Sequence, residues 1–311
     1  MNLGQYERHI QYLFEAARTG TMRAASERLN VATSSISRQI AFLEAELGTP
    51  LLERGRRSIK LTEAGELLIR YYREKQAHDE VYISELQELR GNRSGHIILA
   101  IGEGFVSPLF SRILHQFTDL HSNISLSINI ESSNKVLQLV RDDEAHIGMV
   151  FHSPPDPKIR TVITVPQPLK VIVHPDDPMA QRASIKLSDL AEYRLALPDQ
   201  SFRIREMLSP LEMQAGERLS PIMTTNSLAL LKQFVKDRQG VSILSEIVVF
   251  DELAKGELIA VPLDHLELQT TKFQIVTRLG RLLPIPASNL LKTIETNLRA
   301  AFRNQPAKNT I

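Results

Sequence analysis

The side chains best suited to binding chemistry lie in one short polar stretch near the start of the chain. Within six positions it carries four hydroxyl groups and one guanidinium group, at Thr33, Ser34, Ser35, Ser37 and Arg38. Hydroxyl groups and free N–H groups at the start of a helix can bind phosphate oxygens, and an arginine can reach base edges. The stretch is therefore predicted to contact a nucleic-acid duplex.

A basic segment follows and could extend the same contact. Residues 54–60 hold four cationic side chains around Gly55, which permits a tight turn. The cations are Arg54, Arg56, Arg57 and Lys60. A basic hairpin of this kind can reach a phosphate backbone or a minor groove. A solvated charged hairpin is the alternative, but its place after two closely spaced helices favours binding.

Three helices are predicted to position these groups. Apolar residues recur every three to four positions over residues 6–17 and again over 36–47, as on the buried face of a helix. Between them Thr21 is expected to cap a short helix, which ends in a turn at 30–32. Gly48 is expected to end the third helix. Two close helices, the second beginning with hydroxyl groups, are typical of a reader of the DNA major groove.

Residues 1–62 resemble the N-terminal winged helix-turn-helix of the LysR-type transcriptional regulators. The matching residues are Phe14, Gly20, Ala24, Ala25, Leu29, Ser34, Ser37, Gln39, Ile40, Leu43, Glu44, Leu47, Gly48, Leu51, Arg54, Leu61, Thr62, Ala64 and Gly65. The family often has Ser-Gln where this chain has Ala32 and Thr33. Thr33 is expected to cap the third helix, with a shorter reach toward the bases. The resemblance implies sequence-specific binding of double-stranded DNA.

Residues 63–91 are predicted to form a linker helix. Thr62 can cap it, and Glu63 and Glu66 lie in its first turn. An approximate heptad repeat follows, which is typical of a seam between paired helices. Its positions are Ala64, Leu68, Tyr71, Lys75, His78, Tyr82, Leu86 and Leu89. In the resembling family this helix pairs across a homodimer, whereas the alternative is an amphipathic helix packed on its own domain.

After a break at residues 91–95 the chain changes to alternating strands and helices. Strands are expected at 97–101, 124–130 and 146–151, with helices between them. This alternation predicts parallel sheets covered by helices on both faces. The region resembles the effector-binding domain of the same family, which is built like a two-lobed type 2 periplasmic binding protein.

The predicted fold class is therefore α/β, preceded by an all-α winged helix-turn-helix. The domain limits are 1–62 for the DNA-binding module, 63–91 for the linker helix and 92–311 for the effector-binding domain. Within the last domain, one lobe is expected over about 95–165 and 266–303, and the other over about 166–265. The chain would cross between the lobes near 163–168 and return near 262–270.

A ligand in this architecture is expected in the cleft between the lobes, where strands end and helices begin. The residues predicted to line it are Gly102, Glu103, Gly104, Phe105, Phe151, Ser201, Phe202, Arg205, Thr225 and Asn226. Glu103 would repel an anionic effector. Either the effector carries an amine, or Glu103 faces solvent, and the solvent orientation is favoured. His152 at the end of a strand could sense pH or bind ligand, although loop histidines usually do neither.

The sequence argues against enzymes and metal sites. It contains no Gly-x-Ser-x-Gly, no phosphate loop and no His-Glu-x-x-His, and it has no cysteine. The adjacent acids Asp142 and Asp143 are expected to be solvated. A free-standing solute-binding protein would not carry residues 1–62. No cofactor or metal is predicted, and the polar N-terminus and lack of a long apolar run point to the cytoplasm.

These observations predict a transcriptional regulator rather than an enzyme. The net charge of +1 indicates that any field attracting DNA is local to the N-terminal module. The resemblance implies a homodimer or homotetramer that binds an inverted-repeat operator, responds to a small effector and contacts RNA polymerase.

Overall fold

The protein divides into two compact units, each with its own hydrophobic core. The computed structural model describes residues 3–53, 58–91, 94–215 and 218–302. Contacts separate the chain into Met1–Ile83 and Ser84–Ile311. No helix in the described part of the chain is long and apolar enough to span a membrane.

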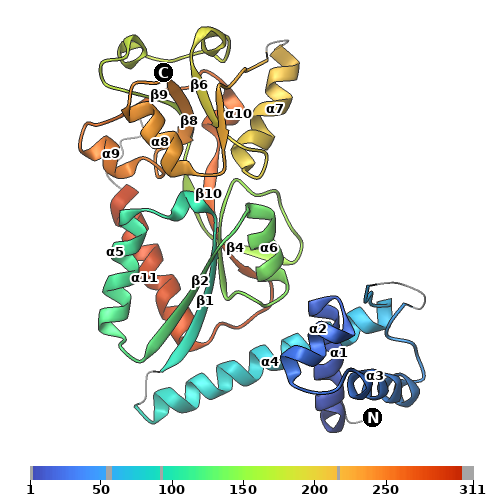
Figure 1. Ribbon diagram of the computed structural model, residues 1–311. Coiled ribbons are helices and arrows are strands. Elements are labelled where there is room, and N and C mark those ends of the chain that lie inside the picture. Colours follow the sequence, from blue (N-terminus) through green and yellow to red (C-terminus); the bar gives the residue numbers. More distant parts are fainter. Residues whose placement is uncertain (1–2, 54–57, 92–93, 216–217, 303–311) are drawn as a thin grey trace. The chain divides into compact units, whose positions relative to one another are not determined.

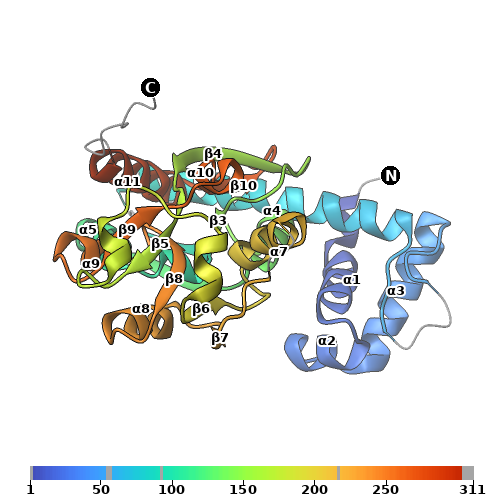
Figure 2. The same cartoon turned by 90° about the horizontal axis from the view of Figure 1, so that it is seen from above.

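Three helices and most of a fourth form the N-terminal unit (Figure 2). They are α1 (Glu7–Thr19), α2 (Met22–Leu29) and α3 (Thr33–Leu47), preceded by a 3-10 turn at Leu3–Tyr6 and followed by α4 (Glu63–Leu89). The predicted cap at Thr21 is confirmed, because its hydroxyl oxygen accepts a hydrogen bond from the Ala24 N–H at 3.1 Å. Gly48 ends α3 in the left-handed conformation, as expected.

The predicted hairpin after α3 has a paired stem. Leu52 and Leu61 form an antiparallel bridge, and the Glu53 N–H donates to the Lys60 carbonyl at 2.9 Å. The stem packs against the helices through a hydrogen bond from the Ile59 N–H to the Gly20 carbonyl at 2.9 Å. The three arginines predicted for the wing, Arg54, Arg56 and Arg57, lie outside the described residues.

The linker helix begins at the predicted residue, but some of the residues predicted to pair with another chain pack inside its own unit. The Thr62 hydroxyl accepts from the Gly65 N–H at 3.1 Å. Leu68 is buried in the core of the winged module, and Lys75 pairs with Glu7 of α1 at 2.6 Å. The assignment of Leu68 and Lys75 to an intermolecular seam was therefore wrong, because α1 lies against this part of the helix. Other seam positions are exposed, namely Tyr71, Tyr82 and Leu89.

The C-terminal unit contains two five-stranded sheets, which form the two lobes (Figure 1). The first, in the order β2-β1-β3-β10-β4, consists of β1 (Gly95–Ile101), β2 (Ile124–Ile130), β3 (Ile147–Phe151), β4 (Ile159–Pro166) and β10 (Lys272–Arg278). The second, in the order β7-β6-β8-β5-β9, consists of β5 (Leu169–Val173), β6 (Leu195–Pro198), β7 (Met223–Thr225), β8 (Val241–Ser245) and β9 (Ile259–Pro262).

Each sheet contains one reversed strand, so the expectation of parallel sheets was wrong. In the first sheet β10 runs antiparallel to both β3 and β4, and in the second β5 runs antiparallel to both β8 and β9. Each reversed strand is the first strand after a crossover between lobes. It enters its sheet from the cleft, whereas the neighbouring strands end there, and its direction must therefore be opposite.

Helices cover both faces of each sheet. In the first lobe α5 packs with α11 on one face and α6 covers the other (Figure 1). The helices of this unit are α5 (Pro108–Leu120), α6 (Ser133–Arg141), α7 (Arg203–Ala215), α8 (Leu228–Lys236), α9 (Phe250–Ala254), α10 (Leu266–Gln269) and α11 (Ile285–Phe302), with 3-10 turns at Glu103–Phe105, Pro178–Gln181 and Ser188–Glu192. Ser107 caps α5, accepting from the Phe110 N–H at 3.3 Å before Pro108 at the first helical position.

The two crossovers between the lobes are held together by buried hydrogen bonds. The Gln167 N–H donates to the Thr271 carbonyl at 2.9 Å, and the Thr271 hydroxyl donates to the Gln167 carbonyl at 2.7 Å. The side-chain oxygen of Gln167 also accepts from the Ile247 N–H at 3.0 Å. Because both side chains are almost fully buried, this pair fixes where the chain passes between the lobes.

Asp143 corrects another expectation. It lies in the turn after α6 with a positive φ of 57°, and its side chain is buried rather than solvated. Its Oδ1 accepts from Arg278 Nε at 2.9 Å and from Arg281 Nη1 at 2.9 Å. Arg278 is the last residue of β10 and Arg281 lies just after it, more than 130 residues from Asp143. The local sequence around Asp142 and Asp143 therefore could not predict these partners.

Candidate functional site

The start of α3 presents most of its predicted contact groups to solvent. Thr33, Ser34, Ser37 and Arg38 are exposed, and Ser35 is half-buried. The first turn of a helix has N–H groups without partners inside the helix and carries the positive end of the helix dipole. The arrangement can therefore bind phosphate while longer side chains reach past it toward bases.

Thr33 does not cap α3. The cap position is Ala32, which has no side-chain acceptor, and α3 begins at Thr33 itself. The Thr33 hydroxyl instead donates to the Ser26 hydroxyl at 3.0 Å and ties α3 to α2. The prediction was wrong by one residue, and the first N–H groups of α3 remain without a side-chain partner from the cap.

Arg38 differs from three of the four arginines of α1 and α2, which pair with glutamates, whereas Arg8 donates to the Tyr12 hydroxyl at 3.2 Å. Arg18 pairs with Glu15 at 2.8 Å, Arg28 pairs with Glu15 at 3.2 Å, and Arg23 pairs with Glu27 at 3.0 Å. Arg38 forms no ion pair with any residue that the structure describes, and its side chain is exposed. Its guanidinium group is thus available for a ligand.

Lys60 lies on the hairpin stem after α3. Its Nζ is 3.7 Å from a Glu53 carboxylate oxygen, and its side chain is 60% exposed. An exposed pair at this distance holds a lysine weakly. Lys60 can therefore exchange Glu53 for a phosphate.

The second candidate site is a cavity of about 370 Å³ between the two lobes. Eight of the ten residues predicted for the cleft line it, namely Gly102, Glu103, Gly104, Phe105, Phe151, Ser201, Phe202 and Asn226. They come from the ends of strands in both sheets. The rule that ligands bind where strands end therefore brings together residues from separate parts of the chain.

Arg205 and Thr225 do not line the cavity. Arg205 pairs with Glu212 on the same helix, and both side chains are largely buried. Arg203 faces the cavity instead, because residues two apart on a helix point to nearly opposite sides. The Thr225 hydroxyl accepts from the Ser227 N–H at 3.1 Å and so serves the turn before α8.

Several lining residues were missed. Ser132 and Ser133 follow β2, and Ser245 and Ile247 follow or end β8. The sequence could have identified these residues, because they also lie where predicted strands end. Applying the strand-end rule to every strand, rather than to glycine-rich or family-like turns, would have found them.

Glu103 faces the cavity, and the solvent orientation favoured from the sequence was wrong. Its Oε1 accepts a hydrogen bond of 2.9 Å from the Leu228 N–H, the first residue of α8 in the other lobe. A carboxylate is stabilised there because the start of a helix offers free N–H donors and a positive dipole end. The partner lies 125 residues away, which the sequence could not reveal.

A second polar link crosses between the lobes at Arg203. Its Nε donates to the His152 carbonyl at 3.1 Å, and its Nη1 donates to Glu206 at 2.7 Å. His152 has a positive φ of 42°. Burial lowers the pKa of the His152 ring below its ordinary value, and the charges of Arg203 and Lys272 lower it further.

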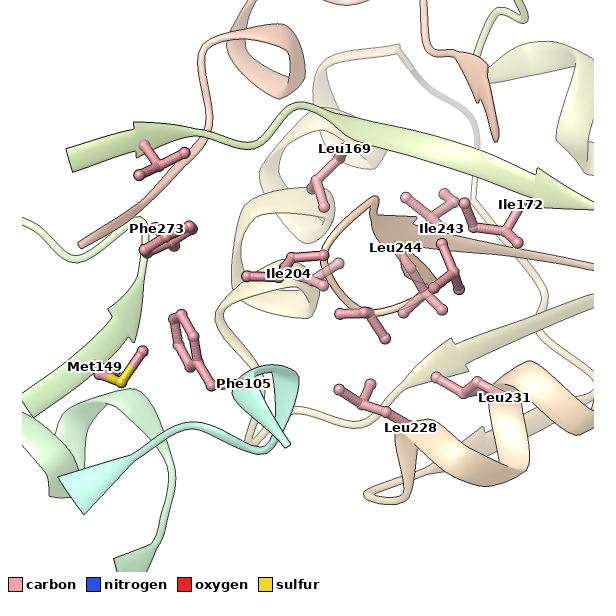
Figure 3. Packing of buried hydrophobic residues seen from close by; sticks show 14 of the residues in the cluster. Phe105, Met149, Leu169, Ile172, Ile204, Leu228, Leu231, Ile243, Leu244 and Phe273 are labelled. Carbon is pink, nitrogen blue, oxygen red and sulfur yellow. The ribbon is translucent and has the colours of Figure 1, made fainter. Parts of the chain in front are cut away.

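Apolar side chains form much of the cavity wall. Phe105 and Phe273 pack edge to face, with ring centroids 5.4 Å apart, and Ile204 and Leu228 line the cavity from the other lobe (Figure 3). Apolar walls with a few polar groups are typical of small-molecule sites. Across the residues that the structure describes, no cluster of three or more His, Asp or Glu side chains could hold a metal ion.

Comparisons with known proteins assign both regions of the chain to one family. Residues 8–66 match the family model for the bacterial regulatory helix-turn-helix protein, lysR family, and residues 90–299 match the LysR substrate binding domain. A probable RuBisCO transcriptional regulator of Emiliania huxleyi is 26% identical over 298 residues, which cover 93% of this chain and 94% of that protein.

Two solved structures share the fold over nearly the whole chain. A full-length OxyR variant from Pseudomonas aeruginosa has a TM-score of 0.65 and 21% identity, covering 100% of this chain and 99% of that one. Full-length CbnR complexed with its target DNA has a TM-score of 0.53 and 19% identity, covering 96% of this chain and 100% of that one.

Proposed function

The chain belongs to the LysR family of transcriptional regulators, which are not enzymes, and from this premise we propose how it recognises DNA. The start of α3 enters a major groove, and Arg38 with Ser34 and Ser37 contacts bases and neighbouring phosphates. The observation that carries this assignment is the exposed Arg38, which pairs with no described residue, whereas Arg18, Arg23 and Arg28 are paired with glutamates and Arg8 contacts Tyr12.

The hairpin after α3 supplies affinity that does not depend on base sequence. Lys60 adds positive charge on the hairpin stem after α3, and the sequence supplies Arg54, Arg56 and Arg57 in the same segment. Contacts of this kind release counterions from the phosphate backbone, so their contribution falls as salt rises. The wing thus sets overall affinity, and α3 sets the choice of operator.

Two copies of the chain bind an inverted-repeat operator as a homodimer, or as a tetramer built from dimers. The exposed Tyr71, Tyr82 and Leu89 on α4 support pairing through this helix, since large apolar side chains on one helix favour a partner. A regulator bound to operator DNA acts in the compartment that holds the DNA, which is the cytoplasm.

A small effector binds in the cavity between the lobes and controls the regulator. The effector must bind one arrangement of the lobes or subunits more tightly than another, because only differential affinity can shift the balance between them. The resulting change in subunit arrangement alters DNA bending or contact with RNA polymerase.

The experiment that tests DNA recognition is a fluorescence anisotropy titration of the full-length protein. The probe is the DNA immediately upstream of its own gene, and a random duplex is the competitor. Tight binding that survives competitor supports the proposal. The proposal is contradicted if the protein binds the upstream DNA no more tightly than the random duplex, and if a genome-wide selection also yields no fragment that it binds more tightly.

Replacement of Arg38 by alanine tests the recognition residue itself. We expect Arg38→Ala to weaken operator binding by about 1–3 kcal/mol and to relax preference at one base position. Arg70→Ala is the matched control, since it removes the same charge from an exposed position on α4. Equal losses in the two variants would mean that Arg38 contributes only general charge.

A further inference from the structure

The start of α8 already holds a carboxylate from the protein itself. The Glu103 side chain of the first lobe accepts from the Leu228 N–H at 2.9 Å. The Ser227 hydroxyl accepts from the Leu230 N–H at 3.4 Å, so two donors of this first turn have internal partners. An anionic ligand at this position would have to displace Glu103 and then remain beside its charge.

The charged residues that line the cavity also disfavour an anionic ligand. Its charged lining residues are Glu103, Glu131 and Arg203. Arg203 already donates to Glu206 and to the His152 carbonyl. Glu131 is exposed and has no side-chain partner among the residues that the structure describes. The cavity therefore holds two carboxylates against one arginine that is already paired, and its field favours a cation.

The cavity walls define the body of the ligand. Phe105, Phe151, Phe202 and Phe273 all line a volume of about 370 Å³, which lies within the range of small-molecule sites. Phenylalanine rings bury apolar groups well and also attract a cation placed over their faces. The same wall thus suits an apolar body and an ammonium group together.

We propose that Glu103 determines the specificity of the cleft and selects an effector with an apolar body of about one aromatic ring and a cationic amine, against carboxylates and phosphates of similar shape. The inference rests on the proposed function of the cavity as the effector site. In the bound state Glu103 would pair with the ammonium group while it remains close to the start of α8.

The test uses two probes that differ in charge but share an aromatic ring on a short chain. They are phenethylamine and 3-phenylpropanoate, titrated calorimetrically into the full-length protein without DNA. We expect phenethylamine to bind at least tenfold more tightly than 3-phenylpropanoate. Equal affinities, tighter binding of the carboxylate, or no binding of the amine at millimolar concentration would overturn the proposal.

Two substitutions at Glu103 separate specificity from a merely structural role. Glu103→Gln removes the charge but keeps an oxygen that can accept from Leu228, and Glu103→Ser also opens space at the start of α8. In both variants the ratio of the affinity for phenethylamine to the affinity for 3-phenylpropanoate should fall at least tenfold. Asp119→Asn, a matched charge change at an exposed position on α5, should keep it.

If Glu103 only joins the lobes, Glu103→Gln will keep the wild-type preference, and the proposal fails. This outcome is distinguishable from failure of the proposed function. Operator binding is measured with wild-type protein and no probe, whereas the charge preference is measured with no DNA.

Discussion

At the scale of single residues, three arginines with the same side chain differ in their contacts because their surroundings differ. Arg38 faces solvent without an ion pair, Arg203 lines a cavity, and Arg205 is buried with Glu212 on its own helix. Arg203 and Arg205 show how small the separation can be. A difference of two positions on α7 decides whether a guanidinium group lines the cavity or pairs with a glutamate along the helix.

His152 gives a pH dependence at this scale. Because burial and nearby positive charge lower its pKa in the folded protein, the folded state binds a proton less readily than the unfolded chain, whose histidines titrate near 6.5. The stability that this site contributes is present above about pH 6.5 and is lost as pH falls through the folded-state pKa.

We therefore expect wild-type protein to lose more thermal stability between pH 7.5 and pH 5 than the variant His152→Asn. Asparagine is chosen because it tolerates the positive φ of 42° at this position. Melting temperatures measured across that range provide the check. Parallel curves for the two proteins would show that His152 contributes nothing to the pH dependence.

At the scale of elements, buried ion pairs hold the first lobe together where sequence-distant segments meet. Asp143 after α6 accepts from Arg278 at the end of β10 and from Arg281 just beyond it. Removal of one partner from a buried ionic cluster takes away part of the compensation for the remaining charges, which is more damaging than loss of an exposed pair.

Asp143→Asn should lower the free energy of unfolding by about 3–5 kcal/mol, because Arg278 and Arg281 keep their charges in a buried site. Asparagine preserves the shape and the left-handed backbone. Urea denaturation followed by circular dichroism measures the change, and Asp119→Asn should stay within about 0.5 kcal/mol of wild type. A similar small change for Asp143→Asn would mean that water reaches the arginines readily.

At the scale of the whole molecule, the exposed part of α4 is the surface best suited to join two chains. Tyr82 is 62% exposed and Leu89 is 84% exposed, although both are large and apolar. By contrast, the first half of the helix is used inside the winged module. One end of α4 thus contributes to the core of the winged module, and the other end leaves the exposed Tyr82 and Leu89 through which we propose that two chains pair.

The double variant Tyr82→Glu/Leu89→Glu should therefore dissociate the oligomer, because paired helices would bring like charges together. Sedimentation velocity should give a single 35.1 kDa species for the variant and a multiple of this mass for wild type. Met213→Glu, at an exposed apolar position on α7, serves as the control and should assemble normally. An unchanged mass for the double variant would exclude α4 as the main interface.

The sequence alone determined the elements whose formation depends on near neighbours. Caps at Thr21 and Thr62, and the end of α3 at Gly48, were predicted correctly because they depend on hydrogen bonds over a few residues. The expectation that ligands bind where strands end identified eight residues of the cavity for the same reason. Each of them lies next to a strand or helix that the local sequence pattern predicts.

Only the tertiary structure decided which distant residues meet. Glu103 reaches Leu228, Asp143 reaches Arg278 at the end of β10 and Arg281 beyond it, and β5 and β10 are reversed by the crossovers between the lobes. None of these contacts changes the spacing or composition of a local segment, so no pattern along the chain records them. They depend on how elements far apart in the sequence pack together, and one of them, the contact of Glu103 with Leu228, places a carboxylate in the cavity.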